Sequence, residues 1–378
     1  MTTVVVSPYN VVNFPEGGGH FWAYMQYVLG LRQLGCQVYW LEQLDPGPET
    51  TQGKAALQVF LERMKSFGLQ DDLILYSATK KSDQIAFVGR NPNQVDSIFR
   101  QADLLINFHY AAEKKILERF QRTALIDIDP GLLQFWISHR QLSVQSHDLY
   151  FTIGETVGTD RALFPDCGLT WIHTRPVVHL ESWPFAYLPG SRAFTSISTW
   201  ETHDWIVGDG ESYDNSKRIS YRKFAELPCI TKQELGLALF LNDQYDAERK
   251  WMESLGWQIW PSVEVTGTPD QYRSFIQGSR GEFGVAKPAY VSFQTSWVSD
   301  RSLCYLASGK PVVAQDTGPS AFLPDGNGLF RFSTTEQAAA AIEAINRSYL
   351  RHCKAARAIA EEYFDSQKVL QELLNRAL

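Results

Sequence analysis

The stretch VSDRSLCYLAS, which begins at Val298, combines the start of a helix with charged and hydroxyl side chains. Ser299 is a residue type that favours the N-cap position, and apolar side chains repeat after it with helical spacing. The first N–H groups of a helix attract anions, because they have no intrahelical acceptor and carry partial positive charge. We therefore predict a phosphate-binding site at four consecutive residues: Ser299, Asp300, Arg301 and Ser302.

Polar side chains flank this predicted helix on both sides. Trp297 precedes it in a hydroxyl-rich loop, and Asp316 and Thr317 follow the next apolar strand. Indole, carboxylate and hydroxyl groups suit the stacking and hydrogen bonding of a sugar. An anion site beside such a rim predicts a ligand in which a sugar is attached to a diphosphate.

A basic run is conspicuous because the chain has a formal net charge of −7. Its cations are Lys217, Arg218, Arg222 and Lys223. One interpretation is a solvated helix face, and the other is a clamp on the diphosphate that begins at Lys217. Arg280 and Lys287 flank a short apolar strand and are candidates to reach the same cleft.

Three consecutive glycines, Gly17, Gly18 and Gly19, follow the first strand and precede a helix. Without a side chain they let the backbone approach a ligand closely, so we predict that Gly18 and Gly19 contact the sugar phosphate or the acceptor. The alternative is a flexible turn. His20 begins the helix, and its ordinary pKa near neutrality suits a general base, the alternative being a surface residue.

Two further candidates follow apolar strands. His109 is expected either to contact the sugar or acceptor or to pack in the core. Asp129 is either a catalytic carboxylate or a residue that shapes a turn. Asp127 and Asp129 have the spacing of a DxD metal motif, but they lie in the half of the chain away from the predicted phosphate site. We therefore predict no metal and no cofactor.

The elements that must position these residues alternate along the chain as strand, helix and strand. Residues 3–7 form an apolar strand, residues 20–34 a helix and residues 37–41 a second strand. The alternation resumes at residue 194, with a loop at 291–298 before the predicted phosphate-binding helix. It ends in two predicted helices, at 335–349 and 351–377.

Between the two series, residues 158–192 are rich in proline and aromatic side chains and show no clear period. We interpret them as a long loop and a linker, with the boundary near Pro189. The sequence thus predicts the α/β class, with two doubly wound, Rossmann-like domains, residues 1–189 and 190–378, facing each other across a cleft. The last helix is expected to pack back on the first domain.

The bulk composition restricts the class of protein. The 378 residues suffice for two domains, and the net charge of −7 argues against a nucleic-acid or anionic-membrane surface. The five cysteines are scattered and no signal-peptide pattern is present, which together favour the cytoplasm. No apolar run is long enough to cross a membrane. The oligomeric state stays open.

One segment resembles a known family. Residues 306–332, LASGKPVVAQDTGPSAFLPDGNGLFRF, are similar to the C-terminal half of group 1 glycosyltransferases with the GT-B fold, which place ASG-(K/R)-PVV and DTG in this order. The glycine loop before the first helix also looks like theirs. The resemblance implies a nucleotide-diphosphate sugar bound mostly by the C-terminal domain and an acceptor bound mostly by the N-terminal domain.

The chain departs from this family in two places. Many members carry a pair of glutamates at the positions that align with Ser296 and Cys304 here, so the acidic pair is absent. Other GT-B enzymes pair an N-terminal histidine with an aspartate, and the nearest segment here, residues 107–109, does not show that pair. The sugar and the retaining or inverting outcome therefore stay open.

Together, the residues and the resemblance predict a metal-independent hexosyltransferase that uses a UDP-, GDP- or dTDP-sugar as co-substrate. The acceptor is expected to be a glycan or a small molecule, and the aromatic linker and N-terminal loops favour an aromatic or amphipathic one. His20, His109 and Asp129 are the expected catalytic residues. Two alternatives are a nucleotide-sugar epimerase or phosphorylase on the same fold, and a non-catalytic binding subunit.

Overall fold

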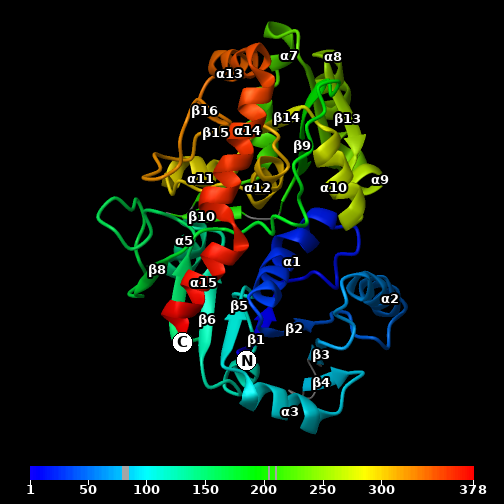
Figure 1. Cartoon of the computed structure of the whole chain (residues 1–378), viewed down its shortest axis with the longest axis vertical. Helices are drawn as coiled ribbons and strands as arrows, with labels where there is room; N and C mark the ends of the chain where they lie inside the picture. Colours follow the sequence, from blue (N-terminus) through cyan, green and yellow to red (C-terminus); the bar gives the residue numbers. More distant parts are fainter. Residues whose placement is uncertain (79–84, 203–204, 209–210) are drawn as a thin grey trace.

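The computed structural model of this chain describes residues 1–78, 85–202, 205–208 and 211–378. Two α/β units lie one above the other along the long axis of the molecule (Figure 1). Each is built on a mostly parallel sheet with helical crossovers, which confirms the predicted class of two doubly wound domains.

The first unit contains an eight-stranded sheet with the order β4-β3-β2-β1-β5-β6-β7-β8. All neighbouring strands are parallel except β3 and β4. The strand order reverses direction between β1 and β5, so the loops that leave these strands diverge and open a crevice. The strands are β1 (Thr3–Ser7), β2 (Gln37–Gln43), β3 (Leu73–Ala78), β4 (Ile85–Val88), β5 (Leu104–Asn107), β6 (Thr123–Asp127), β7 (Leu149–Thr152) and β8 (Trp171–His173).

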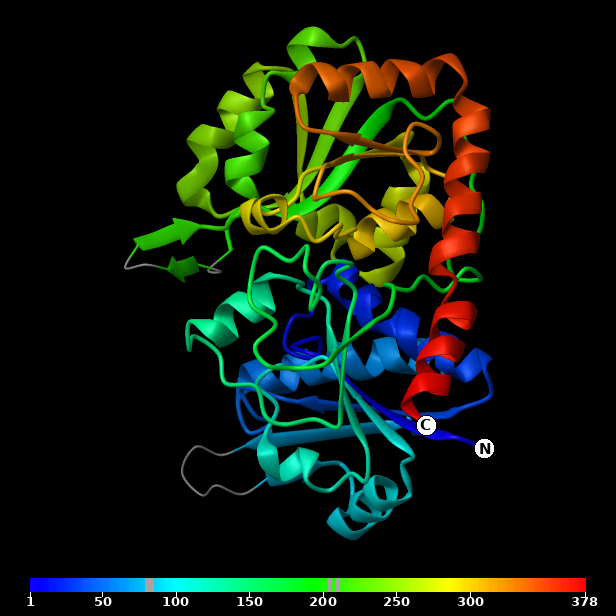
Figure 2. The ribbon, with the colours of Figure 1, turned by 90° about the vertical axis from the view of Figure 1, so that its left-hand side faces the viewer.

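The helices of the first unit begin and end at the expected local signals. Thr50 and Asn91 cap their helices through side-chain oxygens, and Gly35, with φ of +82°, follows the end of α1. α1 is buried over most of its length because it lies between the two units (Figure 2). The helices are α1 (Gly18–Gln33), α2 (Thr51–Ser66), α3 (Pro92–Gln101), α4 (Lys114–Leu117) and α5 (Leu132–Ser138).

The second unit has a six-stranded parallel sheet with the order β13-β12-β9-β14-β15-β16. Here the order reverses between β9 and β14, whose carboxyl ends face the first unit. The strands are β9 (Ala193–Thr199), β12 (Glu234–Phe240), β13 (Trp257–Pro261), β14 (Gly281–Gly284), β15 (Val312–Gln315) and β16 (Leu329–Phe332), and β10 (Trp205–Gly208) and β11 (Glu211–Asp214) form a separate hairpin. The helices are α6 (Lys217–Lys223), α7 (Leu227–Ile230), the 3-10 turn η1 (Asp243–Tyr245), α8 (Asp246–Ser254), α9 (Ser262–Thr266), α10 (Pro269–Gly278), α11 (Pro288–Phe293) and α12 (Asp300–Ala307).

Two segments that the sequence predicted to be loops contain regular structure. The predicted loop at 291–298 overlaps α11, which Pro288 starts at a position where a fixed φ favours the helix. Gln294 ends this helix in the left-handed conformation. The predicted linker contains β8, three residues that pair in parallel with β7.

The predicted single helix at 351–377 is wrong. The structure has α13 (Thr335–Arg347), α14 (Tyr349–Ile359), a π turn η2 (Ala360–Phe364) and α15 (Ser366–Ala377). Asp365 interrupts the run and caps α15 by accepting from Gln367 N at 3.0 Å. The break lets the chain cross from the second unit to the first, where α15 lies beside α1 (Figures 1 and 2). Gly30 permits this approach, because a Cβ there would lie 2.6 Å from Ser366 Cβ.

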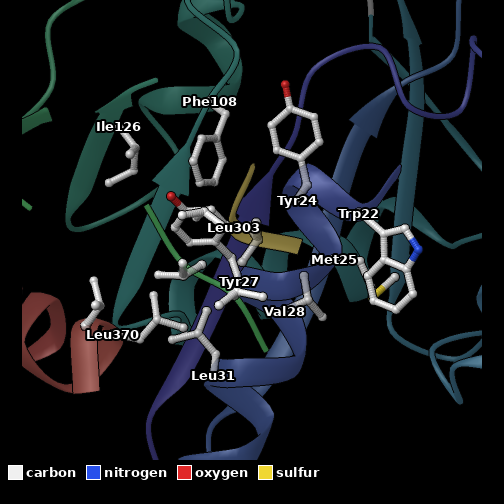
Figure 3. Close-up of a cluster of buried hydrophobic side chains, with 14 of the residues drawn as sticks. Trp22, Tyr24, Met25, Tyr27, Val28, Leu31, Phe108, Ile126, Leu303 and Leu370 are labelled. Atoms are coloured by element: carbon white, nitrogen blue, oxygen red, sulfur yellow. The ribbon is translucent and has the colours of Figure 1, made fainter. Parts of the chain in front are cut away.

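One hydrophobic cluster runs through both units. Figure 3 shows Tyr27 and Leu31 of α1 beside Leu303 of α12 and Leu370 of α15, all of which belong to this cluster. A large apolar interface resists relative motion of two domains. The shared core therefore fixes the geometry of the space between the units.

Candidate active site

A cavity of about 790 Å³ lies between the two domains. It opens where the strand orders reverse, at the carboxyl ends of the strands, which is where doubly wound folds bind ligands. Aromatic side chains dominate the wall that the first domain contributes. They are Tyr9, Phe14, Tyr24, Tyr27, Phe108, Tyr110 and Trp136. The second domain contributes Lys287, Trp297, Val298 and Asp300 to the opposite side.

His20 lies in this wall on α1, and its ring meets Tyr24 edge-on with centroids 5.3 Å apart. Its Nε2 lies 2.7 Å from the carbonyl of Tyr9, which assigns the proton to Nε2 and the lone pair to Nδ1. Burial lowers the pKa of His20, and the Tyr9 carbonyl and the Asp300 charge offset only part of this effect. The ring is thus neutral at pH 7 and able to accept a proton.

His109 faces the same cavity from the loop after β5. Asn107 fixes that loop, because its side chain accepts from His109 N and donates to His109 O, both at 3.0 Å. The ring contacts Tyr9 with centroids 5.0 Å apart. Burial lowers the pKa of His109 to about 4. The structure therefore brings His20 and His109 together around Tyr9.

Asp129, the third predicted catalytic residue, also lines the cavity. Each of its two carboxylate oxygens accepts a hydrogen bond from a tyrosine hydroxyl. Tyr110 OH donates at 3.2 Å and Tyr290 OH donates at 2.5 Å. Tyr290 belongs to α11, so this carboxylate joins the two domains. Asp127 lies buried behind it, and burial raises the pKa of Asp127 to about 7.

The predicted phosphate-binding helix exists as α12, and Ser299 is its N-cap by position. The Ser299 hydroxyl does not cap the helix N–H groups and donates to Asp300 at 3.3 Å instead. A second, small cavity of about 30 Å³ adjoins this end of α12. Predicted site residues in its wall are Trp297, Ser299, Arg301, Ser302 and Thr317. Since Trp297 lines both cavities, the two spaces meet at this loop.

Arg301 is largely committed within the protein. Its Nε donates to Glu282 at 2.6 Å and its Nη1 donates to the carbonyl of Ile197 at 2.8 Å, and the side chain is almost fully buried. Burial acts to lower the pKa of Arg301, but the Glu282 charge outweighs it and the pKa is raised. Arg301 thus ties α12 to β9 and β14.

The cations of the predicted basic run have different surroundings in the structure. Arg218 and Arg222 both pair with Glu248, at 2.5 and 3.4 Å; Arg222 is exposed, as a solvated face requires, but Arg218 is partly buried. Lys217 lies toward α12: burial and the charges of Arg301 and Lys287 lower its pKa to about 7. A phosphate near these cations would stabilise the charged form of Lys217.

Arg280, a candidate from the sequence, does not reach this site. It lies before β14, at the opposite end from Lys287, where it stacks on Tyr349 at 4.0 Å and bonds Asn346 at 2.6 Å. Lys287 follows the carboxyl end of the strand and lines the interdomain cavity. Ligands bind at the carboxyl ends of parallel strands, so the cation that follows β14 can contact a ligand and the cation that precedes it cannot.

Thr317 holds the loop that carries Trp297, whereas Asp316 shapes the turn after β15 and lines neither cavity. The Thr317 hydroxyl donates to the carbonyl of Trp297 at 2.7 Å, and Asp316 accepts from Gly318 N at 3.0 Å. Gly18 and Gly19 pack against the second domain. A Cβ at Gly18 would lie 2.4 Å from the carbonyl of Thr266. These glycines therefore allow α1 to approach α9 and α10 closely.

Several residues of the site were not among the sequence candidates, among them Tyr24, which lines the cavity, and Tyr290, which donates to Asp129. Tyr24 lies one helical turn after His20, and this spacing is a local signal that could have identified it. Tyr290 contacts Asp129 only in the folded chain, so no sequence pattern predicts this contact.

Solved structures of glycosyltransferases share the two-domain arrangement. An alpha-glucosyltransferase (AGT) in complex with UDP is 12% identical, with a TM-score of 0.63 over 100% of both chains. An alpha-glucosyltransferase in complex with UDP and a 13-mer DNA containing a HMU base is 11% identical, with a TM-score of 0.63 over 99% of this chain and 98% of that one. Anabaena Alr3699/HepE in complex with UDP and glucose is 10% identical, with a TM-score of 0.56 over 100% and 99%. The chain therefore has the GT-B fold that the resemblance implied.

No protein-family profile and no curated protein matches the sequence. Within the residues that the structure describes, no group of three or more histidine, cysteine, aspartate or glutamate side chains is arranged to hold a metal ion. None of the helices in those same residues combines the length and apolar character needed to span a bilayer.

Proposed function

We propose that this chain is a glycosyltransferase that transfers a sugar from a uridine-diphosphate sugar to an acceptor hydroxyl. One observation carries the proposal: a single interdomain cavity places neutral His20 in one wall and the start of α12 in the other. A leaving diphosphate gains negative charge, which helix N–H groups and cations stabilise. A neutral histidine accepts the proton that the acceptor hydroxyl loses.

The donor half of this proposal rests on the residues around α12. Lys217 and Lys287 supply positive charge, and the loop at Trp297 offers a ring and hydroxyls for the sugar or the base. Uridine is the base that we propose, because the solved structures with this fold were determined with UDP. No metal is assigned to the transfer, since Lys217, Lys287 and the helix end account for the charge.

The acceptor that fits the first-domain wall is an aromatic or amphipathic small molecule. Seven aromatic side chains face the cavity there, and stacking on such rings favours flat or apolar groups. Four of the alpha-glucosyltransferase structures with this fold were determined with DNA. The net charge of −7 and the aromatic wall of this chain nevertheless favour a small molecule. A glycan is the second acceptor class to test.

Binding of UDP to the purified protein tests the donor half. We expect calorimetry to show UDP binding more tightly than GDP or dTDP. Replacing Lys217 by Met should weaken UDP roughly ten- to hundredfold, the usual loss when a charged hydrogen-bond partner is removed. Lys223→Met is the matched control, because Lys223 lies on the same helix, is exposed and contacts Phe224. Failure of all three nucleotides to bind would refute the proposal.

Turnover experiments separate the proposal from its rivals. A glycosyltransferase releases UDP from UDP-glucose faster when a suitable acceptor is present. An epimerase converts the nucleotide sugar without any acceptor, and a phosphorylase requires inorganic phosphate. A non-catalytic subunit binds UDP but gives no product with any acceptor in a panel of phenols, amphipathic alcohols, oligosaccharides and DNA.

A further inference from the structure

Three side chains form a continuous path from the donor side of the cleft to the acceptor wall. The Trp297 ring stacks on Tyr290 with centroids 4.3 Å apart and an interplanar angle of 15°. The Tyr290 hydroxyl donates to Asp129 at 2.5 Å. Trp297 lines both cavities, and Asp129 lines the interdomain cavity from the first domain.

The first-domain end of this path is held in place. The second oxygen of Asp129 accepts from Tyr110 OH, which in turn accepts from Ile128 N at 3.0 Å. The backbone N–H of Asp129 donates to Asp127 at 3.0 Å. These bonds orient the carboxylate toward the Tyr290 hydroxyl, which adds a contact from the second domain.

The second-domain end of the path lies beside the proposed donor site. Tyr290 is buried, so its hydrogen bond to a carboxylate is shielded from water and depends strongly on geometry. Trp297 lies in a loop between α11 and α12, beside the predicted phosphate-binding helix end. Because the two rings are stacked face to face, a ligand that fixes Trp297 also fixes Tyr290.

We propose that Tyr290 is a positioning residue that couples donor binding to the acceptor wall through its hydrogen bond to Asp129. This inference rests on the proposed function for the identity of the donor and adds an order to it. A bound UDP-sugar stabilises residues 128–138, and the acceptor then meets a fixed wall. By thermodynamic reciprocity, an acceptor held by that wall strengthens donor binding by the same factor.

Hydrogen exchange with UDP as the probe tests the coupling in the full chain. In the native protein, UDP is expected to slow amide exchange in residues 288–299 and also in residues 128–138. Tyr290→Phe keeps the ring and its stack on Trp297 but lacks the hydroxyl. In this variant UDP should still protect 288–299, while its protection of 128–138 falls about tenfold, the effect of losing one hydrogen bond to a charged group.

Glu155→Gln is the matched control, because it weakens a different contact between the domains. Glu155 accepts from Ser320 Oγ and from Ala321 N, at 2.5 and 2.7 Å. This variant should keep the effect of UDP on residues 128–138. The coupling is refuted, while the donor site stands, if UDP protects only 288–299 in the native protein or if Tyr290→Phe leaves both responses intact. If UDP protects neither segment, the proposed function fails together with the coupling.

Discussion

At the scale of single residues, His20 is the group whose replacement tests the proposed chemistry most directly. His20→Gln keeps a side-chain donor for the Tyr9 carbonyl but removes the base. We expect kcat to fall roughly a hundredfold or more, within the range of a lost general base. In the native enzyme, activity should decline on the acid side with an inflection below pH 6.5, because burial lowers the pKa of His20 from that value.

His139→Gln provides the matched control for this experiment. His139 lies at the exposed end of α5, is stacked on Phe135 at 4.0 Å and does not line the cavity. Its replacement should change neither kcat nor the pH profile. A His20→Gln enzyme with native kcat would show that another group takes the proton, and His109 would be the next residue to replace.

The burial of Lys310 leads to a prediction about stability. It is fully buried between α12 and β15, and its Nζ has no hydrogen-bond partner within the part of the chain that the structure describes. Burial lowers the pKa of Lys310 from 10.5 to about 8. Between these values the unfolded chain binds more protons than the folded one, so the free energy of unfolding should rise with pH across this window.

Lys310→Met should remove this dependence and raise stability at pH 7 by roughly 1–3 kcal/mol, because an apolar group of similar length replaces a buried charge. Urea unfolding at several pH values measures both effects. Lys354→Met, an exposed change on α14, is expected to alter neither. A variant less stable than the native protein at pH 7 would show that the Lys310 ammonium has a stabilising partner.

At the scale of elements, the sequence predicted what local signals determine. The start of α12 at Ser299, the strand before it and the alternation of both domains follow from caps and apolar periodicity. The break at residues 360–365 was missed, because a helical pattern of apolar residues continues through it. The one local signal for the break is Asp365, an N-cap residue type that accepts from Gln367 N at the start of α15.

Element packing also explains why the site was predicted only in part. His20, His109 and Asp129 follow strands, and the ends of parallel strands meet at one edge of a sheet. Arg301 lies at the start of α12, as the sequence predicts, but its guanidinium forms an ion pair with Glu282 of β14. Which partner a charged residue meets depends on how α12 packs on the sheet, and the sequence near Arg301 does not contain that information.

At the scale of the whole molecule, the cleft depends on how closely the domains approach each other. Trp22 Nε1 donates to the carbonyl of Pro269 at 2.9 Å, across the boundary between the domains. Gly19 leaves room for the Tyr272 ring, since a Cβ there would lie 2.5 Å from it. The sequence predicts that these glycines contact the sugar phosphate or the acceptor. A glycine-rich turn has the same sequence pattern whether a ligand or another backbone packs against it.

Gly18→Ala distinguishes these two roles. The added methyl would lie 2.4 Å from the carbonyl of Thr266 and 2.5 Å from that of Thr268, so α1 must move away from the second domain. We expect a loss of about 1–3 kcal/mol in stability, as for other overpacked contacts, together with a lower kcat/KM because His20 moves with α1. Gly278→Ala is the control in the facing helix, because its methyl meets no atom within 4 Å. If Gly18→Ala weakened UDP binding and left the melting temperature unchanged, the glycine would be a ligand contact and the packing argument would be wrong.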